Sequence, residues 1–303
     1  MTALNCADLL SPPFRFLIGN SKDVVAIHTD LVARHSTPLR NLMKGEMVEA
    51  QTGFATIHDV DLATFLRFAG YVYLGDYDGD SPEETSSEIQ DSATLTGGNV
   101  DMAESGPGEE APTHEYPAPE AQWDWRPFSH PNPTCKRCKR PLPTTPPTKP
   151  VLSKKEQSWE VFTQNTSNPA SKYPSLRSKS TWTKWHSVFL SHARIYVFAD
   201  KYDIPSLGDL SIQKLRESLV DFNPCSEQLE SLYPLIRYTY DNTPDRGIDV
   251  DQDGNIDALR DLVNTYLAFI LEHVLGDPEM TELVVEKREF ASDLLLKLSL
   301  RLY

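Results

Sequence analysis

The sequence predicts an α+β fold in which a small sheet flanked by helices is followed by an all-α C-terminal region. Near the N-terminus, two short runs rich in β-branched and aromatic residues surround a turn, which is typical of a hairpin. Apolar residues then recur at spacings of three and four, first behind this hairpin and again from about residue 182 to the end, which is typical of helices.

The predicted hairpin joins a strand at Phe14–Gly19 to a strand at Val24–His28. Thr29 or Asp30 is expected to cap the helix that follows. Pro38 is expected to divide the next apolar stretch into two short helices, because proline disrupts the interior of a helix.

A third strand is expected at Gly53–Val60, with Phe54 and Ile57 contributing to the core. The helix after it is expected at Leu62–Leu74, where apolar residues lie at helical spacing. Asp61 is suited to cap this helix, since its short carboxylate can accept hydrogen bonds from the first backbone N–H groups.

The segment 78–180 differs from its surroundings. It is rich in Pro, Ser, Thr and Gly, lacks Lys and Arg before Arg126, and carries basic residues beyond that point. Such a composition buries too little apolar surface to offset chain entropy, so the segment is predicted to be a largely disordered, acidic-then-basic insertion. Within it, two aromatic islands are able to dock onto a folded neighbour: Trp123–Trp125 with Phe128, and Trp159–Phe162.

Helical spacing returns at His186–Tyr202, and Pro205 is expected to end this helix. Ser206 is a candidate cap for the next helix. Two further apolar stripes follow, and Pro278 is expected to open a last helix that reaches Leu302.

Charge and cysteine content exclude several classes of protein. Lys and Arg total 29 against 44 Asp and Glu, for a formal charge of −15. Binding of nucleic acid or of an anionic membrane through bulk charge needs a positive surface, so neither partner is expected. Few, scattered cysteines favour a reducing compartment, and no signal peptide or membrane-spanning apolar run is recognised. The sequence therefore predicts an intracellular protein, cytoplasmic or nuclear.

Four stretches of the N-terminal segment follow one another in the order typical of a known interaction domain. Val25–Ser36 places a histidine, a leucine and a serine at the usual intervals, and Gly45–Ala50 reads Gly-x-Met-x-Glu. Ile57–Phe65 ends in Thr-Phe after an Asp-Val-Asp run, and Tyr71–Tyr77 reads Tyr-Val-Tyr-Leu-Gly-Asp-Tyr. Together these stretches resemble the BTB/POZ family, which implies a small sheet flanked by helices.

His192–Ile204 resembles the helix with which a BTB/POZ domain resumes after an insertion. The region of Leu207 and Leu215 resembles its continuation, although Ser211 stands where alanine is more usual. The arrangement is most similar to BTB/POZ proteins of filamentous fungi, in which a long polar insertion divides the domain. The resemblance implies four segments: the first part of the domain at 1–77, the insertion at 78–180, the completing helices at 181–222 and a C-terminal helical region at 223–303.

The resemblance also bears on self-association. Many BTB/POZ domains exchange an extra N-terminal helix and strand between subunits. Few residues precede Phe14 in this sequence. A homodimer is therefore compatible with the sequence, but an N-terminal strand swap is not expected.

Met47, Val48 and Glu49 match the hydrophobic-x-Glu element through which some BTB/POZ proteins contact a cullin ubiquitin-ligase scaffold. An apolar anchor beside a carboxylate, on a short exposed segment, suits such a contact. The alternative is that Met47 packs locally and Glu49 is only solvated.

Cys135 and Cys138 form a CxxC pair, with His130 five residues earlier. Thiolates at this spacing can share one tetrahedral zinc ion, but a structural site needs four ligands and no second CxxC exists. We therefore favour no special role for the pair and expect no cofactor. The basic residues at 136–140 are also compatible with a nuclear-import cluster.

The stretch 249–257 resembles the front of an EF-hand calcium loop, with Asp at its first, third and fifth positions and Gly at its sixth. Its twelfth position, where a bidentate Glu is required, is Arg260. We therefore favour an acidic loop in which Asp257 caps the following helix.

No common catalytic motif occurs, and His28 and His35 fall inside the BTB-like pattern, where structural histidines are expected. The sequence therefore predicts a non-catalytic protein–protein interaction adaptor, and in a narrower version a substrate adaptor of a cullin-type ubiquitin ligase. The alternatives are a nuclear, transcription-associated scaffold without direct DNA reading and a calcium-responsive protein.

Overall fold

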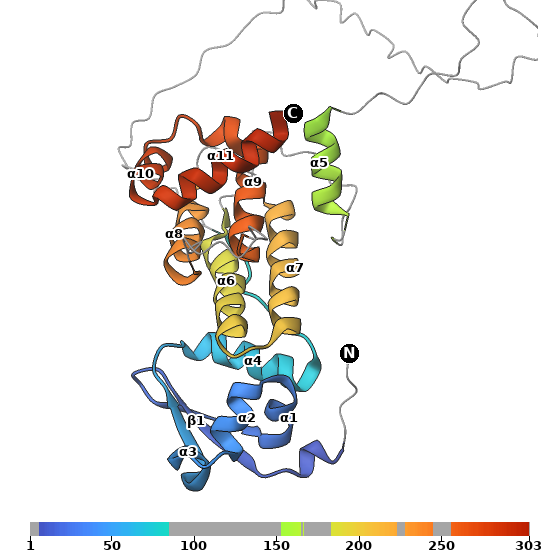
Figure 1. Cartoon of the computed structure of the whole chain (residues 1–303), viewed down its shortest axis with the longest axis vertical. Helices are drawn as coiled ribbons and strands as arrows, with labels where there is room; N and C mark the ends of the chain where they lie inside the picture. The colour runs from blue at the N-terminus through green and yellow to red at the C-terminus, as the bar shows by residue number, and fades with distance from the viewer. Residues whose placement is uncertain are drawn as a thin grey trace, which may run out of the picture. The chain divides into compact units, whose positions relative to one another are not determined.

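A computed structural model describes residues 6–84, 153–164, 166, 183–222, 228–244 and 256–302, all within one compact unit. These residues form a mixed α+β fold with a small three-stranded sheet and many helices (Figure 1), which confirms the α+β class that the sequence predicts. None of the helices in these ranges has the length and apolar content that crossing a bilayer requires.

The sheet is built from β1 (Pro13–Ile18), β2 (Asp23–His28) and β3 (Phe54–Ile57). Strands β1 and β2 are antiparallel, which confirms the predicted hairpin. Gly19 in the turn has a φ of 63°, a left-handed conformation that glycine adopts without strain. Strand β3 lies parallel to β1, so the strand order is β2-β1-β3.

Helices α1 (Thr29–His35) and α2 (Thr37–Lys44) confirm the predicted division into two short helices. The break falls at Ser36, whose hydroxyl accepts a hydrogen bond from the N–H of Leu39 at 3.0 Å. Pro38 lies in the first turn of α2, where its missing N–H costs nothing.

The predicted caps of α1 are wrong, because the helix already begins at Thr29 and His28 occupies the N-cap position. The Thr29 hydroxyl instead donates to the carbonyl of Pro12 at 2.7 Å. This hydrogen bond holds the chain that precedes β1. In that chain, Asp8 of the short helix η1 (Asp8–Leu10) forms an ion pair with Arg34 of α1.

Strand β3 is shorter than predicted, and one of its two expected core residues is wrong. Ala55 and Ile57 are buried, whereas Phe54 is 41% exposed. Successive side chains of a strand point to opposite faces, so residues three apart cannot both enter the core. Asp61 caps α4 (Leu62–Leu74) as predicted, accepting a hydrogen bond from the N–H of Thr64 at 2.9 Å.

Part of the predicted insertion belongs to the fold. Helix α5 (Lys154–Thr163) lies within 78–180, and its Trp159 and Phe162 are 3% and 7% exposed. The two-residue strand β4 (Glu83–Glu84) pairs with β5 (Thr183–Lys184), so the two ends of the intervening chain meet at one ladder. Most of the predicted insertion lies outside the described residues.

Helices α6 (His186–Lys201) and α7 (Pro205–Asp221) follow β5 and form a helical hairpin. Pro205 starts α7 as expected, but the predicted Ser206 cap is wrong because Ile204 occupies the N-cap position. The Ser206 hydroxyl lies 2.7 Å from that of Tyr71 on α4, so it joins α7 to α4.

In the described part of the C-terminal region, the chain adds η2 (Leu229–Ser231), α8 (Tyr233–Asn242), α9 (Ala258–Val274), α10 (Pro278–Glu286) and α11 (Arg288–Leu302). The single helix predicted from Pro278 to Leu302 is therefore wrong, since it breaks at Lys287. Lys287 is neither glycine nor proline, so no local signal marks the break. Its ammonium group pairs with Asp241 of α8 at 2.5 Å, a contact distant in sequence.

Two apolar cores result, and α6 contributes to both. The N-terminal core gathers the inward side chains of the sheet, α1, α2 and α4, among them Phe14, Phe16, Ile18, Leu31, Phe65 and Phe68. The C-terminal core gathers those of α5 and α7–α11, among them Leu232, Ile236, Leu259, Tyr266, Phe269 and Phe290. Phe189 of α6 belongs to the second core and Phe198, two and a half turns later, to the first.

Candidate functional site

The residues predicted to contact a cullin lie at the start of the short helix α3 (Val48–Thr52), on the surface of the N-terminal core. Met47 is the N-cap and Val48 the first helical residue, and their side chains are 57% and 69% exposed. Glu49 follows and is half-buried. Met47 therefore does not pack locally, contrary to the alternative considered from the sequence.

Two glycines set the position of this helix. At Gly45, which follows α2, a Cβ atom would lie 2.4 Å from the carbonyl oxygen of Asn41, so only glycine lets the chain turn away so closely. At Gly53, which follows α3, φ is 71° and the N–H donates to the Glu49 carbonyl at 2.9 Å. Helix α3 is thus fixed at both ends by backbone geometry that side chains would disturb.

Phe54 extends this exposed area, and sequence reasoning missed it. It starts β3 directly after Gly53, and the Thr52 hydroxyl donates to its carbonyl at 3.5 Å. Strand β3 is an edge strand of the sheet. The exposed apolar side chains of Met47, Val48 and Phe54, with the Glu49 carboxylate, are called the α3–β3 surface below. The alternation of Phe54 with Ala55 was the signal that could have found it.

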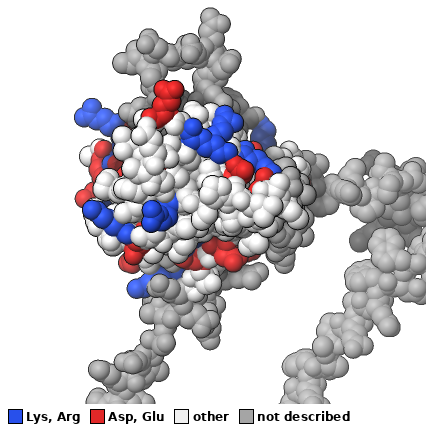
Figure 2. Space-filling model, turned by 90° about the horizontal axis from the view of Figure 1, so that it is seen from below, with Lys and Arg blue, Asp and Glu red and all other residues white. Residues whose placement is uncertain are grey.

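The N-terminal core presents charges of both signs. Figure 2, which views the molecule from the end of this core, shows Lys and Arg side chains interspersed with Asp and Glu and separated by broad uncharged areas. Exposed cations include Lys44, which pairs with Asp30. An apolar anchor in such surroundings is typical of a protein interface, where charge is depleted at the centre and retained at the rim.

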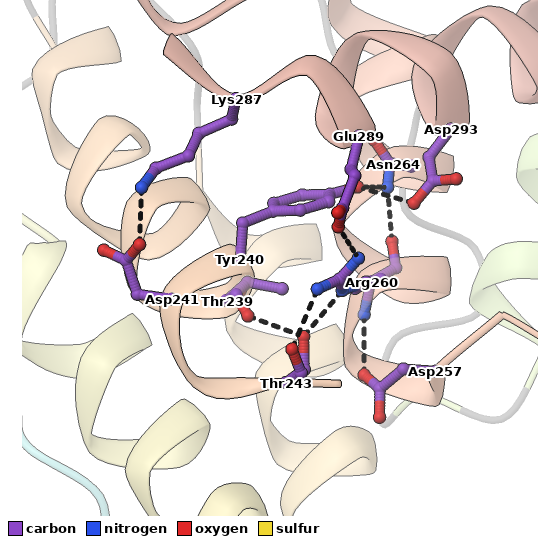
Figure 3. A network of polar contacts seen from close by, with 10 residues as sticks. All are labelled: Thr239, Tyr240, Asp241, Thr243, Asp257, Arg260, Asn264, Lys287, Glu289 and Asp293. Atoms are coloured by element: carbon purple, nitrogen blue, oxygen red, sulfur yellow. Dashed lines mark hydrogen bonds and ion pairs between the residues drawn. The ribbon is translucent and has the colours of Figure 1, made fainter. Parts of the chain in front are cut away.

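Arg260, the residue that interrupts the calcium-loop pattern, is a buried structural group. It is 1% exposed, and its guanidinium donates to the hydroxyl and the carbonyl of Thr243 at 2.7 and 2.8 Å and to Glu289 at 2.7 Å (Figure 3). It also lies over the ring of Tyr240, 4.5 Å from the centroid. Arg260 thereby ties the end of α8 to α9 and α11.

Asp257 caps α9 as predicted. Its Oδ1 atom accepts from the N–H groups of Leu259 and Arg260 at 2.9 and 3.1 Å, and its Oδ2 atom accepts from the Tyr196 hydroxyl at 2.7 Å. Both carboxylate oxygens of Asp257, the ninth position of the calcium pattern, are therefore engaged at the start of a helix. Residues 249–255 of the acidic loop lie outside the described residues.

The network around Arg260 continues into the C-terminal core. Asn264 donates to the Arg260 carbonyl at 2.8 Å and to the Tyr240 hydroxyl at 2.6 Å (Figure 3). The Tyr240 hydroxyl in turn donates to the carboxylate of Asp293 at 3.0 Å. The Asn264 amide nitrogen and the Tyr240 hydroxyl thus link α8, α9 and α11 through buried hydrogen bonds, which fixes how these helices pack. The geometry indicates a structural role.

The histidines also have structural partners. His28 lies 2.7 Å from the Tyr73 hydroxyl, and His35 packs edge-on against Tyr71, where burial lowers its pKa. His192 is buried, with Nδ1 2.9 Å from the hydroxyl of Tyr77. Burial lowers the pKa of His192 to about 4, and nearby cations act in the same direction. This neutral pair joins the chain that follows α4 to α6.

The predicted metal ligands Cys135, Cys138 and His130 lie outside the described residues. Within the described ranges, no group of three or more His, Cys, Asp or Glu side chains is arranged to hold a metal ion.

Comparison with known proteins found no matching family model, no matching curated protein and no matching solved structure.

Proposed function

We propose that this chain is a non-catalytic protein–protein interaction adaptor built on a BTB/POZ-like core, and that its α3–β3 surface contacts a cullin-type ubiquitin-ligase scaffold. The observation that carries the proposal is the exposure of Met47 and Val48, 57% and 69%, directly before the Glu49 carboxylate. Large apolar side chains gathered at one exposed element are typical of a binding surface.

The topology agrees with what the sequence resemblance implies. A hairpin is followed by the helical pair α1 and α2, a third strand parallel to β1, and α4. After the intervening chain, Ile195 and Phe198 of α6 enter the same core as Phe65 and Phe68. One apolar core is thus completed by segments from both sides of the insertion, as expected of a divided domain.

Met47 is the residue with which we would test this proposal. Desolvation of an apolar anchor at the centre of an interface is worth about 2 kcal/mol or more, which corresponds to roughly 30-fold in affinity. Met47→Asp replaces that gain with the cost of desolvating a charge. Because Met47 is exposed, the substitution should leave the fold intact.

The experiment measures binding of the full chain to the purified N-terminal domain of a cullin by titration calorimetry. Met47→Asp should weaken binding by roughly 30-fold or more. Leu74→Asp is a matched control, because Leu74 is 78% exposed but lies at the end of α4. Equal binding by the parent and the Met47→Asp chain would dispose of the cullin contact. Affinity purification with the same two chains then tests the broader adaptor role, which requires that Met47→Asp lose specific partners.

A further inference from the structure

Helix α5 is attached to the C-terminal core through one face. Among its described residues, Trp159, Phe162 and Thr163 are buried, at the spacing of three and four that marks one side of a helix. The remaining described positions, including Val161 at 65%, are exposed. The helix therefore lies on the body of the protein as an amphipathic ligand lies in a groove.

The surface beneath α5 is aromatic. Trp159 meets the ring of Phe269 edge-on, with centroids 5.2 Å apart, and Phe162 packs against Phe269 and Tyr266 at 5.5 and 6.2 Å. The guanidinium of Arg216 lies 5.6 Å from the centre of the Phe162 ring. Figure 1 shows α5 beside α7 and α9, the helices that supply these residues. We call this area, Arg216 with Tyr266 and Phe269, the α7–α9 groove.

Its composition is that of a binding site. Tyr, Phe and Arg are enriched at the centres of protein interfaces, where a few such side chains provide most of the affinity. Tyr266 and Phe269 are almost fully buried with α5 in place, and removal of α5 would uncover the faces that Trp159 and Phe162 now contact. An uncovered aromatic surface of this kind recruits a partner.

Helix α5 is only marginally stable as a helix without the groove. It spans Lys154–Thr163, and isolated helices shorter than about 12–15 residues are marginal in water even with a good cap. Its cap is good: Ser153 and Glu156 form a reciprocal capping box. A helix that starts well but is too short to persist alone folds when it docks, so docking and folding are one equilibrium.

We infer that the α7–α9 groove is a second protein-docking site, for an amphipathic partner helix that carries two aromatic side chains at positions i and i+3, and that α5 occupies it in cis. Because α5 belongs to the same chain, its local concentration at the groove is high, so a partner helix binds only when it displaces α5. The inference is independent of the α3–β3 surface and of any cullin.

The test uses a fluorescently labelled peptide of residues 153–166 as the probe and full-length chains as receptors. Trp159→Ala with Phe162→Ala disables the cis helix and should raise the affinity for the peptide at least tenfold over the parent. The same double substitution in the peptide should abolish binding, as should adding Phe269→Ala to the receptor. Equal affinity of the parental and disabled receptors would overturn the inference.

A second measurement decides the matter if the disabled receptor fails to fold. Protease sites are placed in the full chain at 145–151 and 170–176, on either side of α5, and the folded protein is then cut. The freed helix should separate from the body on gel filtration, and the body should then bind the labelled peptide. If the cut helix stays with the body and no peptide exchanges, α5 is a permanent part of the core and the groove is not a docking site.

Discussion

Replacing Arg260 with glutamate tests two interpretations at once. Glutamate is the residue that an EF-hand loop requires at its twelfth position, so Arg260→Glu restores the calcium pattern that begins at Asp249. If the acidic loop were a calcium site spoiled by one substitution, the variant should gain calcium binding. If Arg260 is a structural group, as its contacts indicate, the variant should lose stability.

The contacts set the expected loss. The Arg260 side chain is 2% exposed and donates two hydrogen bonds to Thr243, which stay unmet when the guanidinium is removed. Its partner Glu289 is 47% exposed, so that ion pair is screened by water and adds little. The new carboxylate is itself buried without a partner, and an uncompensated buried charge typically costs about 3–5 kcal/mol. For a protein of this size, that corresponds to a melting temperature lower by roughly 6–20 °C.

The assay is thermal unfolding followed by circular dichroism, with and without millimolar calcium. Arg194→Glu is the matched control, since Arg194 is 43% exposed and lies 3.7 Å from Asp61; it should cost about 1 kcal/mol or less. The reasoning is refuted if Arg260→Glu melts with the parent, or if calcium raises the melting temperature of the variant above that of the parent.

Three further predictions concern His192, the intervening chain and the N-terminal core. Burial lowers the pKa of His192 from 6.5 to about 4, so protonation favours the unfolded state as the pH falls from 6.5 to 4. His192→Asn should therefore remove up to about 3 kcal/mol from the pH dependence of the free energy of unfolding in urea. An unchanged pH dependence would contradict a neutral buried histidine. Replacing 87–151 with a flexible linker should leave the melting temperature unchanged. Deleting 78–180, which removes α5, should lower the melting temperature. Equal melting temperatures of these two variants would argue against the packing of α5. Phe65→Leu in the N-terminal core should lower the free energy of unfolding by about 1 kcal/mol. Because α6 joins both cores, the unfolding transitions followed by tryptophan fluorescence and by circular dichroism should shift together. Two separated transitions would show that the cores unfold independently.

Features encoded by neighbouring residues could be predicted from the sequence. The hairpin, the helix Leu62–Leu74 and the caps Asp61 and Asp257 each depend on a turn, an apolar period or a short carboxylate within a few residues. The exposure of Met47 was one of two alternatives, and it came from the family resemblance rather than from the neighbouring residues. The alternation of a strand is also local, so placing Phe54 in the core was an avoidable error.

Features that depend on distant contacts could not be predicted. Helix α5 is ordered because Trp159 and Phe162 pack against Phe269, about a hundred residues later in the sequence. The sequence indicated that this aromatic island could dock, but neither the helix nor the docking surface. The break at Lys287 has no glycine or proline, and the role of Arg260 depends on Thr243 across a loop. In each case a tertiary contact outweighs the local pattern.

The two ends of the intervening chain meet at the β4–β5 ladder, which explains how one fold accommodates the insertion. The chain leaves the N-terminal core after Tyr77 and returns at the β4–β5 ladder, immediately before α6. Helix α6 then places Phe189 in the C-terminal core and Phe198 in the N-terminal core, about 13 Å further along the same helix. A continuous helix shared by two cores cannot tilt in one without repacking the other. The α3–β3 surface belongs to the first core and the α7–α9 groove to the second, so partners bound at the two would be held by one continuous fold. Joining two proteins in a defined arrangement is what an adaptor requires.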